Sequence, residues 1–140
     1  MRENMGLYRG KRKDNGEWIE GAYSPYNWDF FGEREEKPQI IIISDDKNID
    51  GLWCEVIPET VGQYTGLTDK NGVRIFEGDI VSLTKYSNLI YKVVYELCRY
   101  ELVNSKGVNC FVLDIYKSKD IEVIGNIHDN PELLGKAENP

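Results

Sequence analysis

Short strand-forming runs separated by tight turns fill residues 61–81, which read VGQYTGLTDKNGVRIFEGDIV. The DKNG segment at 69–72 is typical of a hairpin connection, because Asn and Gly tolerate the positive φ of a tight reversal. It predicts strands at 65–68 and 73–76. The EGD segment at 77–79 predicts a second turn, which leads into a strand of β-branched and aliphatic residues. This alternation strongly favours antiparallel β structure.

The same turn chemistry recurs on both sides of this stretch. An Asn-Gly pair at 15–16 predicts a hairpin between strands at 7–11 and 17–20, and the NSKG segment at 104–107 predicts another. Further strands are expected at 39–44, 52–57, 90–103, 108–115 and 121–127. The alternation of apolar residues shifts phase near Glu96-Leu97, which predicts a sharp bend or bulge there. The charged run 33–38 is interpreted as a solvated loop.

These elements predict an all-β protein with an amino-terminal β unit, residues 1–60, and a second unit, residues 61–140. Pro58 ends the strand at 52–57 and marks the boundary. Short, bent antiparallel strands in the second unit suit a small closed barrel. Helix is expected only as one turn at 131–135, where Asn130 is a candidate cap and Pro131 occupies the first position.

Composition excludes several classes of protein. The net charge of −7 argues against a protein that coats nucleic acid without regard to sequence. The longest apolar run, Ile40 to Ile43, is only strand-sized, and the first residues resemble no signal peptide, so a cytoplasmic protein is expected. Cys54, Cys98 and Cys110 are odd in number and lie in strand-like runs, which predicts reduced structural thiols.

Two groups of residues are candidate binding sites. Gln63, Tyr64 and Thr65 combine an aromatic ring with hydrogen-bonding groups, although ordinary turn and strand chemistry explains them as well. The second group places the cations Arg9, Lys11, Arg12 and Lys13 near aromatic residues that include Trp18, as binding to single-stranded nucleic acid would require. The alternative is that these aromatics fill a core and the cations are simply solvated.

No catalytic, metal or cofactor site is predicted. The carboxylates of the EGD turn lack nearby ligands to complete a metal site, so a plain turn is preferred. His128 is the only histidine, and we interpret it as a surface or capping residue. An enzyme that joins His128 to a cysteine or carboxylate through the fold stays open only as a third alternative.

The motifs QYTGL at 63–67, DKNG at 69–72 and EGDIV at 77–81 together resemble the signature of the YopX family of phage and prophage proteins. The resemblance extends to the segments GKR at 10–12, DNGEW at 14–18, PET at 58–60 and VIGNI at 123–127, while residues 26–50 match no pattern. It implies phage origin and an SH3-like barrel in the second unit, and it carries no established biochemical function.

The expected function is therefore a non-enzymatic accessory module that binds a host or phage macromolecule. Protein is preferred to nucleic acid as the partner, and self-association is expected because strand edges and aromatic surface need covering. The alternative is a nucleic-acid-binding protein that uses the basic, aromatic amino-terminal unit. No cofactor and no membrane is expected.

Overall fold

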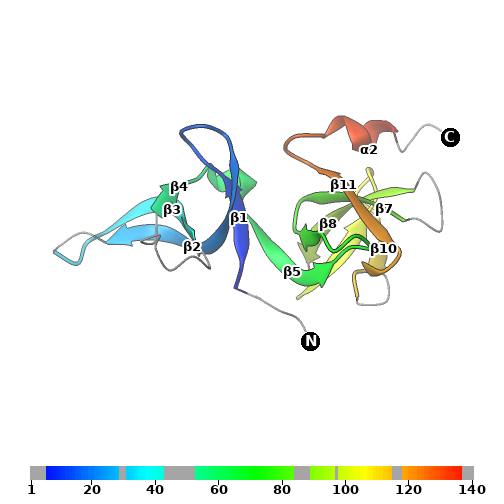
Figure 1. Ribbon diagram of the computed structural model, residues 1–140, viewed down its shortest axis with the longest axis horizontal. Coiled ribbons are helices and arrows are strands. Elements are labelled where there is room, and N and C mark those ends of the chain that lie inside the picture. The colour runs from blue at the N-terminus through cyan, green and yellow to red at the C-terminus, as the bar shows by residue number, and fades with distance from the viewer. Residues whose placement is uncertain are drawn as a thin grey trace. The chain divides into compact units, whose positions relative to one another are not determined.

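The chain folds mostly into β-strands, arranged in two antiparallel sheets with one short helix (Figure 1). The computed structural model describes residues 6–28, 31–42, 53–83, 89–96, 98–114 and 118–136. Two compact units are present, which we call the amino-terminal unit, Gly6–Gln63, and the carboxy-terminal unit, which begins at Tyr64. The all-β prediction is thus confirmed. The predicted boundary between the units lies after residue 60, and the observed boundary lies after residue 63.

The amino-terminal unit is built on four strands, with a short 3-10 turn and the first residues of a fifth strand after them. They are β1 (Tyr8–Lys11), β2 (Trp18–Trp28), β3 (Arg34–Ile42), β4 (Trp53–Glu55), η1 (Pro58–Thr60) and β5 (Gly62–Thr68). The strand order is β4-β3-β2-β1-β5. The predicted hairpin around residues 15–16 joins β1 to β2, with Lys11 opposite Trp18.

The amino-terminal unit has a small core. Ile40 and Val56 are fully buried, and a bridge between Arg12 and Val56 links the end of β1 to the chain just after β4. Gly21 permits the close packing, because a Cβ built at this position would stand 1.9 Å from the carbonyl oxygen of Ile41. The strands can therefore approach closely only with glycine at position 21.

The charged run 33–38 is not the predicted loop. Residues 34–38 belong to β3, where Glu35 lies opposite Asn27 and Arg34 opposite Trp28. The side chains of residues 33–36 are exposed, so this part of the strand lacks the apolar alternation that a half-buried strand shows. The hydrogen-bonded ladder with β2 forms nevertheless.

The carboxy-terminal unit contains the rest of β5, six further strands and the helix. They are β6 (Arg74–Phe76), β7 (Asp79–Leu83), β8 (Ile90–Glu96), β9 (Arg99–Val103), β10 (Asn109–Val112), β11 (Ile121–Asn126) and α2 (Glu132–Lys136). The hairpins predicted at 69–72 and 104–107 and the turn at 77–79 are all present. The five-stranded sheet has the order β10-β9-β8-β7-β11. No sheet among the described residues closes on itself. Both sheets are therefore open, and the predicted closed barrel is not confirmed.

One side of the five-stranded sheet packs into the main core. Its central members are aliphatic or aromatic side chains that point to the same side from successive strands, as a period of two requires. The buried residues are Leu67, Ile75, Val81, Leu83, Tyr91, Val93, Tyr100, Leu102, Leu113 and Ile121. No helix among the described residues is long and apolar enough to cross a membrane.

The shift in the apolar alternation near Glu96 is caused by a reversal of the chain and not by the predicted bend or bulge. β8 ends at Glu96 and β9 begins at Arg99, directly opposite it, so the chain reverses completely. Cys98 adopts a positive φ of 62° in this reversal and is exposed, which corrects its prediction as a strand-embedded thiol. The hairpin was missed because residues 97–98 are Leu-Cys, without the Gly or Asn that usually marks such a turn.

The predicted terminal helical turn is confirmed as α2. Asn130 contributes differently from the expected side-chain cap. Its Oδ1 accepts a hydrogen bond from the N–H of Asn126 at 3.2 Å, while its backbone carbonyl accepts one from Leu133 at 3.1 Å. The side chain therefore stabilises the turn that precedes the helix.

Candidate functional site

The predicted recognition segment 63–65 lies at the start of β5. Thr65 is only 1% exposed. Its hydroxyl donates to the carbonyl of Ile75 at 2.8 Å and accepts from the N–H of Leu67 at 3.2 Å. Both hydrogen-bonding functions of the hydroxyl thus support the β5–β6 hairpin, as the structural interpretation of this motif expects.

The side chain of Tyr64 also faces inward. Its ring centroid lies 5.4 Å from that of Phe76, and the guanidinium of Arg74 lies 5.9 Å from the ring. Gln63 is half-buried, and its backbone pairs with Tyr8 of β1. In this segment, Gln63 alone has a partly exposed side chain.

Asp69 of the DKNG motif organises the turn around itself. Its Oδ1 accepts hydrogen bonds from the N–H groups of Asn71 at 2.8 Å and Val73 at 2.9 Å. Its Oδ2 accepts a third from the N–H of Val123 in β11 at 2.9 Å. With 6% exposure, this carboxylate is a structural anchor that ties the hairpin to β11.

The two carboxylates of the EGD turn differ in burial. Asp79 is buried, and its Oδ2 accepts from the N–H of Phe76 at 2.7 Å. Glu77 is half-buried, and its burial raises the pKa of its carboxyl above the ordinary 4.5. His128 Nε2 lies 3.8 Å from the position that a Cβ on Gly78 would occupy. The turns at 77–79 and 127–129 are therefore neighbours.

The amino-terminal unit brings Arg9, Lys11 and Trp18 together. Alternation along β1 places both cations on the same face, and Lys11 lies opposite Trp18 in β2. The guanidinium of Arg9 lies 4.8 Å from the indole ring and the ammonium of Lys11 lies 5.5 Å from it. Both distances allow a cation–π interaction. The sequence prediction of clustered cations and aromatics is accurate for these three residues.

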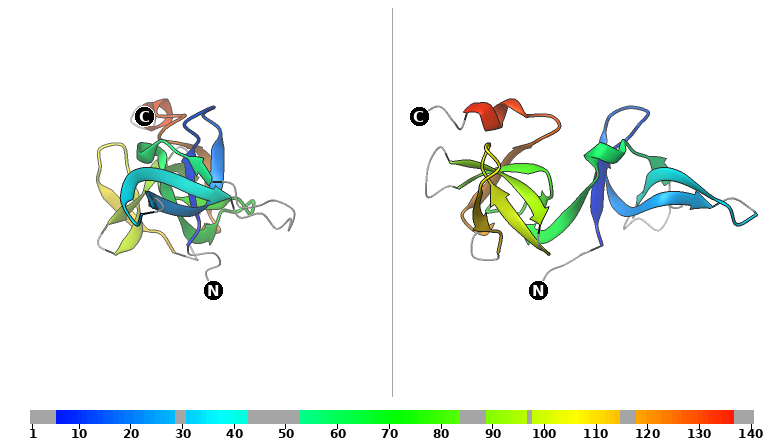
Figure 2. Two further views of the ribbon diagram at one scale, coloured as in Figure 1. Left: turned by 90° about the vertical axis from the view of Figure 1, so that its left-hand side faces the viewer. Right: turned by 180° about the vertical axis from the view of Figure 1, so that it is seen from behind.

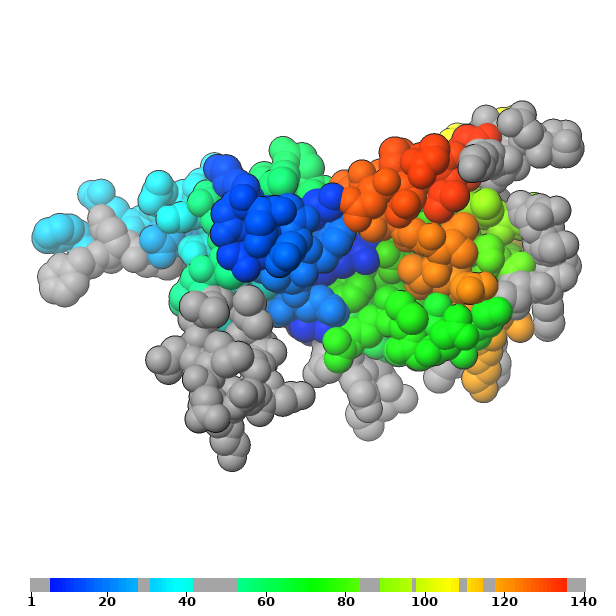
Figure 3. Space-filling model, turned by 45° about the horizontal axis from the view of Figure 1, so that its top comes forward, coloured from blue at the N-terminus to red at the C-terminus, as the bar shows by residue number. Residues whose placement is uncertain are grey.

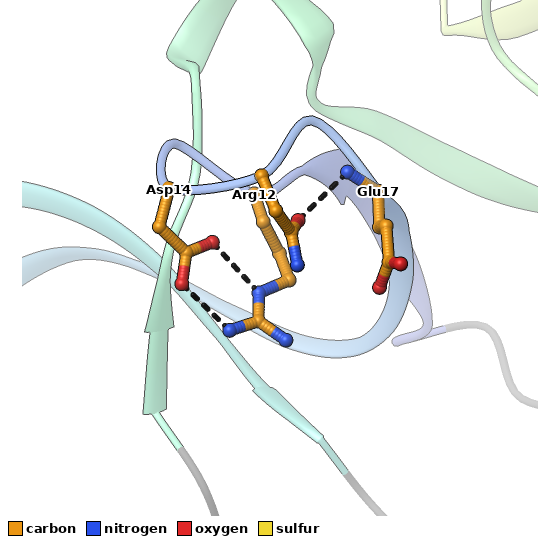
Figure 4. Close-up of polar contacts among 4 residues, drawn as sticks. Arg12, Asp14 and Glu17 are labelled. Carbon is orange, nitrogen blue, oxygen red and sulfur yellow. Dashed lines mark hydrogen bonds and ion pairs between the residues drawn. The ribbon is translucent and has the colours of Figure 1, made fainter.

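Arg12 lies in a different environment, in the turn that follows β1. Its Nε and Nη2 donate to the two carboxylate oxygens of Asp14 at 2.9 Å and 2.7 Å (Figure 4). This bidentate pair lowers the pKa of Asp14 below its ordinary 3.8 and raises that of Arg12. Lys13 pairs with Glu55 at 3.4 Å. Two cations of the predicted basic group are thus matched by acids within the unit.

These pairs border a surface hollow of about 340 Å³, which we call the Trp53 hollow. Its lining residues are Arg12, Lys13, Asp14, Trp53, Cys54 and Glu55. Trp53 keeps 56% of its surface exposed, while Cys54 is half-buried and reduced. An exposed indole beside two ion pairs in a concave surface combines apolar contact with charged groups, which is the composition of a protein-binding site.

Sequence reasoning missed Trp53 as a site residue. The signal was present in the sequence, where the polar Glu55 two residues after Trp53 indicates the outward face of the strand, and Trp53 is indeed exposed. A large aromatic side chain on the outward face of a short strand is the residue to suspect. The sequence does not indicate, however, that residues 12–14 lie beside Trp53.

The described residues contain no grouped metal ligands. Among the described residues, no three His, Cys, Asp or Glu side chains are gathered so that they could hold a metal ion. The backbone N–H of His128 donates to Oδ1 of Asn126 at 3.0 Å, which places His128 in the turn after β11.

Comparison with known proteins identifies a family and a similar solved structure. The family model described as YopX protein matches residues 7–135 of the chain. The crystal structure of protein EF1440 from Enterococcus faecalis is similar with a TM-score of 0.52 and 27% sequence identity, over 91% of this chain and 96% of that chain. No curated protein matches the chain.

Proposed function

Because this chain belongs to the YopX family, we propose that it is a non-enzymatic accessory binding module of phage or prophage origin. It acts in the cytoplasm of a bacterial host and engages a protein through its amino-terminal unit. We further propose that the carboxy-terminal unit is related to SH3-like barrels, because its strands are short, antiparallel and interrupted by register shifts.

The observation that carries this proposal is the exposure of Trp53 in the hollow. Tryptophan is enriched among the residues that dominate binding energy, and such residues lie in concave, largely apolar centres with a polar rim. The ion pairs Arg12–Asp14 and Lys13–Glu55 supply polar groups in the same hollow. A partner that covers Trp53 would remove a large apolar surface from water without leaving a charge unpaired.

Nucleic-acid binding is the second candidate function, supported by the cluster of Arg9 and Lys11 on Trp18. The local charge disfavours it. Asp14 and Glu55 match Arg12 and Lys13, and Glu17 and Glu20 follow in the same hairpin. Phosphate binding requires a surplus of cations, so protein is the preferred partner.

The test is retention from a host lysate on immobilised protein, with and without nuclease treatment. We expect a protein that resists nuclease to be retained by the wild type and lost with Trp53→Ala. Val73→Ala is the matched control, because Val73 is 48% exposed but lies in the carboxy-terminal unit. Material that disappears on nuclease treatment, or that Trp53→Ala retains in full, would overturn the proposal.

A further inference from the structure

The β2–β3 hairpin continues beyond the strands that flank it. β1 pairs with β2 only up to Gly21, and β4 pairs with β3 only from Gln39 onward. Among the described residues, 26–28 and 34–36 have only each other as strand partners, and we call residues 24–28 and 31–37 the arm (Figures 1 and 2). In the space-filling view its cyan atoms project from the body of the amino-terminal unit (Figure 3).

Local contacts stiffen the arm. The hydroxyl of Ser24 donates to the carbonyl of Tyr26 at 2.8 Å, and the guanidinium of Arg34 lies 4.6 Å from the ring of Tyr26. A two-stranded ribbon is nevertheless only marginally stable in water, and three strands or packing against another element are normally needed. The arm therefore has the properties of an element that is covered in an assembly.

Strand addition is a poor way to cover it. Pro25 and Pro38 have no N–H to donate, and charged side chains at 33–37 line the outer strand. These are the devices that prevent edge-to-edge pairing. Contact through side chains near the tip is favoured instead, and Phe31 is 85% exposed there.

The Trp53 hollow has the complementary features. It offers an exposed indole for an aromatic ring, and the cations Arg12 and Lys13 also line it. The arm also carries exposed glutamates, Glu35 and Glu36, four and five residues after Phe31 in the sequence. The 3.4 Å ion pair of Lys13 with Glu55 is exposed and weak, and the ammonium has three N–H donors, so Lys13 can bind a glutamate of an arriving arm while it keeps Glu55.

The arm cannot fill the hollow of its own chain. Glu55 lies opposite Gln39 and Trp53 opposite Ile41, so the hollow sits beside the base of the arm. Between residues 24 and 28 the arm extends about 13 Å away from that base, and its tip lies further out. An arm and a hollow that match but do not meet within one chain can meet between two copies.

We propose that the arm of one copy docks into the Trp53 hollow of a second copy, with Phe31 packed on Trp53 and Glu35 facing Lys13. Each copy has one arm and one hollow, so a reciprocal exchange closes a two-fold dimer. This inference rests on the proposed function, because it uses the same hollow as a protein-binding site and names a second copy of the chain as its occupant.

Disulfide trapping tests the contact directly, because Cys54 lines the hollow. In a background carrying Cys98→Ser and Cys110→Ser, Glu33→Cys keeps the Phe31 anchor and should form a disulfide between residues 33 and 54 of different copies under mild oxidation. Mixing isotopically light and heavy protein before oxidation identifies the interchain peptide by mass. The control, Val73→Cys, should give no link to residue 54. A link within one chain, or none at all, would contradict the docking.

Sedimentation equilibrium measures the dissociation constant of the dimer. Phe31→Ala should weaken dimerisation by at least about 30-fold, as removal of a central aromatic anchor does. Lys13→Glu and Glu35→Lys should each weaken it, and the double variant should recover most of the loss. Val73→Ala should leave it unchanged.

A wild type that stays monomeric at all concentrations would overturn the self-docking. The proposed function is judged separately, by whether a host protein is still retained in a Trp53-dependent way.

Discussion

Asp69 shows how much structure one residue of the central motif maintains. Its carboxylate accepts three backbone hydrogen bonds, one of them from Val123, 54 residues further along the chain. The turn role of Asp69 follows from its neighbours in sequence, since Asp before Asn-Gly commonly bonds its own turn. The bond to β11 could not be predicted, because no local pattern indicates which distant N–H a buried carboxylate will meet.

Replacing Asp69 should therefore destabilise the carboxy-terminal unit. Asp69→Ala leaves three N–H groups without an acceptor, and we expect a loss of about 2–4 kcal/mol in the free energy of unfolding by urea denaturation. Asp69→Asn should lose less, because one oxygen remains as an acceptor while the amide NH₂ opposes an N–H. A loss below about 0.5 kcal/mol for Asp69→Ala would contradict the anchoring role.

The glycines of the amino-terminal core make a second prediction at the scale of the residue. A Cβ at Gly21 would stand 1.9 Å from a backbone oxygen, whereas a Cβ at Gly10 would stand 3.2 Å from the side chains of Ile40 and Val56. Gly21→Ala should cost at least about 3 kcal/mol, since the backbone itself must shift, and Gly10→Ala about 1 kcal/mol. Thermal unfolding of both variants checks this order, and equal melting temperatures would refute it.

Glu77 should make stability depend on pH. Burial raises its folded pKa above the unfolded value of about 4.5, so the folded state favours the protonated carboxyl. The contribution of Glu77 is then fully present below pH 4.5 and is lost as the pH rises through the folded pKa. Glu77→Gln should match the wild type in acid and exceed it at pH 7, by less than about 1 kcal/mol because the group is half-exposed. Parallel stability profiles of the two proteins would contradict this.

At the scale of the element, turn chemistry decided which hairpins were predictable. The connections at 15–16, 71–72 and 104–107 contain Asn and Gly, and their Gly residues all have positive φ. The β8–β9 reversal uses Cys98 at the same kind of φ and was therefore invisible in the sequence. Likewise, the outer half of β3 has no buried face, so its charges resembled a loop.

The strain at Cys98 is testable. A non-glycine residue with positive φ costs free energy that glycine avoids, and the exposed Cys98 has little packing to lose. Cys98→Gly should raise the free energy of unfolding by about 0.5–1 kcal/mol in urea, under reducing conditions. Cys98→Ala is the control and should give no gain. A destabilised Cys98→Gly would show that the turn does not limit the stability of this hairpin.

At the scale of the whole molecule, the sequence identifies the β class, but it does not locate the Trp53 hollow. The hollow combines residues 12–14 with residues 53–55, two segments that approach only because the chain after β4 bridges back to Arg12. The cluster of Arg9, Lys11 and Trp18 could be predicted because one hairpin holds all three. Local sequence thus reveals sites within a hairpin and hides those between distant strands.

The charge of the whole chain yields the last prediction, which separates the two candidate functions. With a net charge of −7 and with Arg12 and Lys13 matched by acids, the protein should show no measurable affinity for single-stranded oligonucleotides at 150 mM salt. Fluorescence anisotropy with labelled DNA and RNA is the measurement. Any binding at low salt should weaken steeply as salt rises and should disappear with Lys11→Glu combined with Arg12→Glu. Tight binding at 150 mM salt that this variant abolishes would make nucleic acid, and not protein, the ligand of the amino-terminal unit.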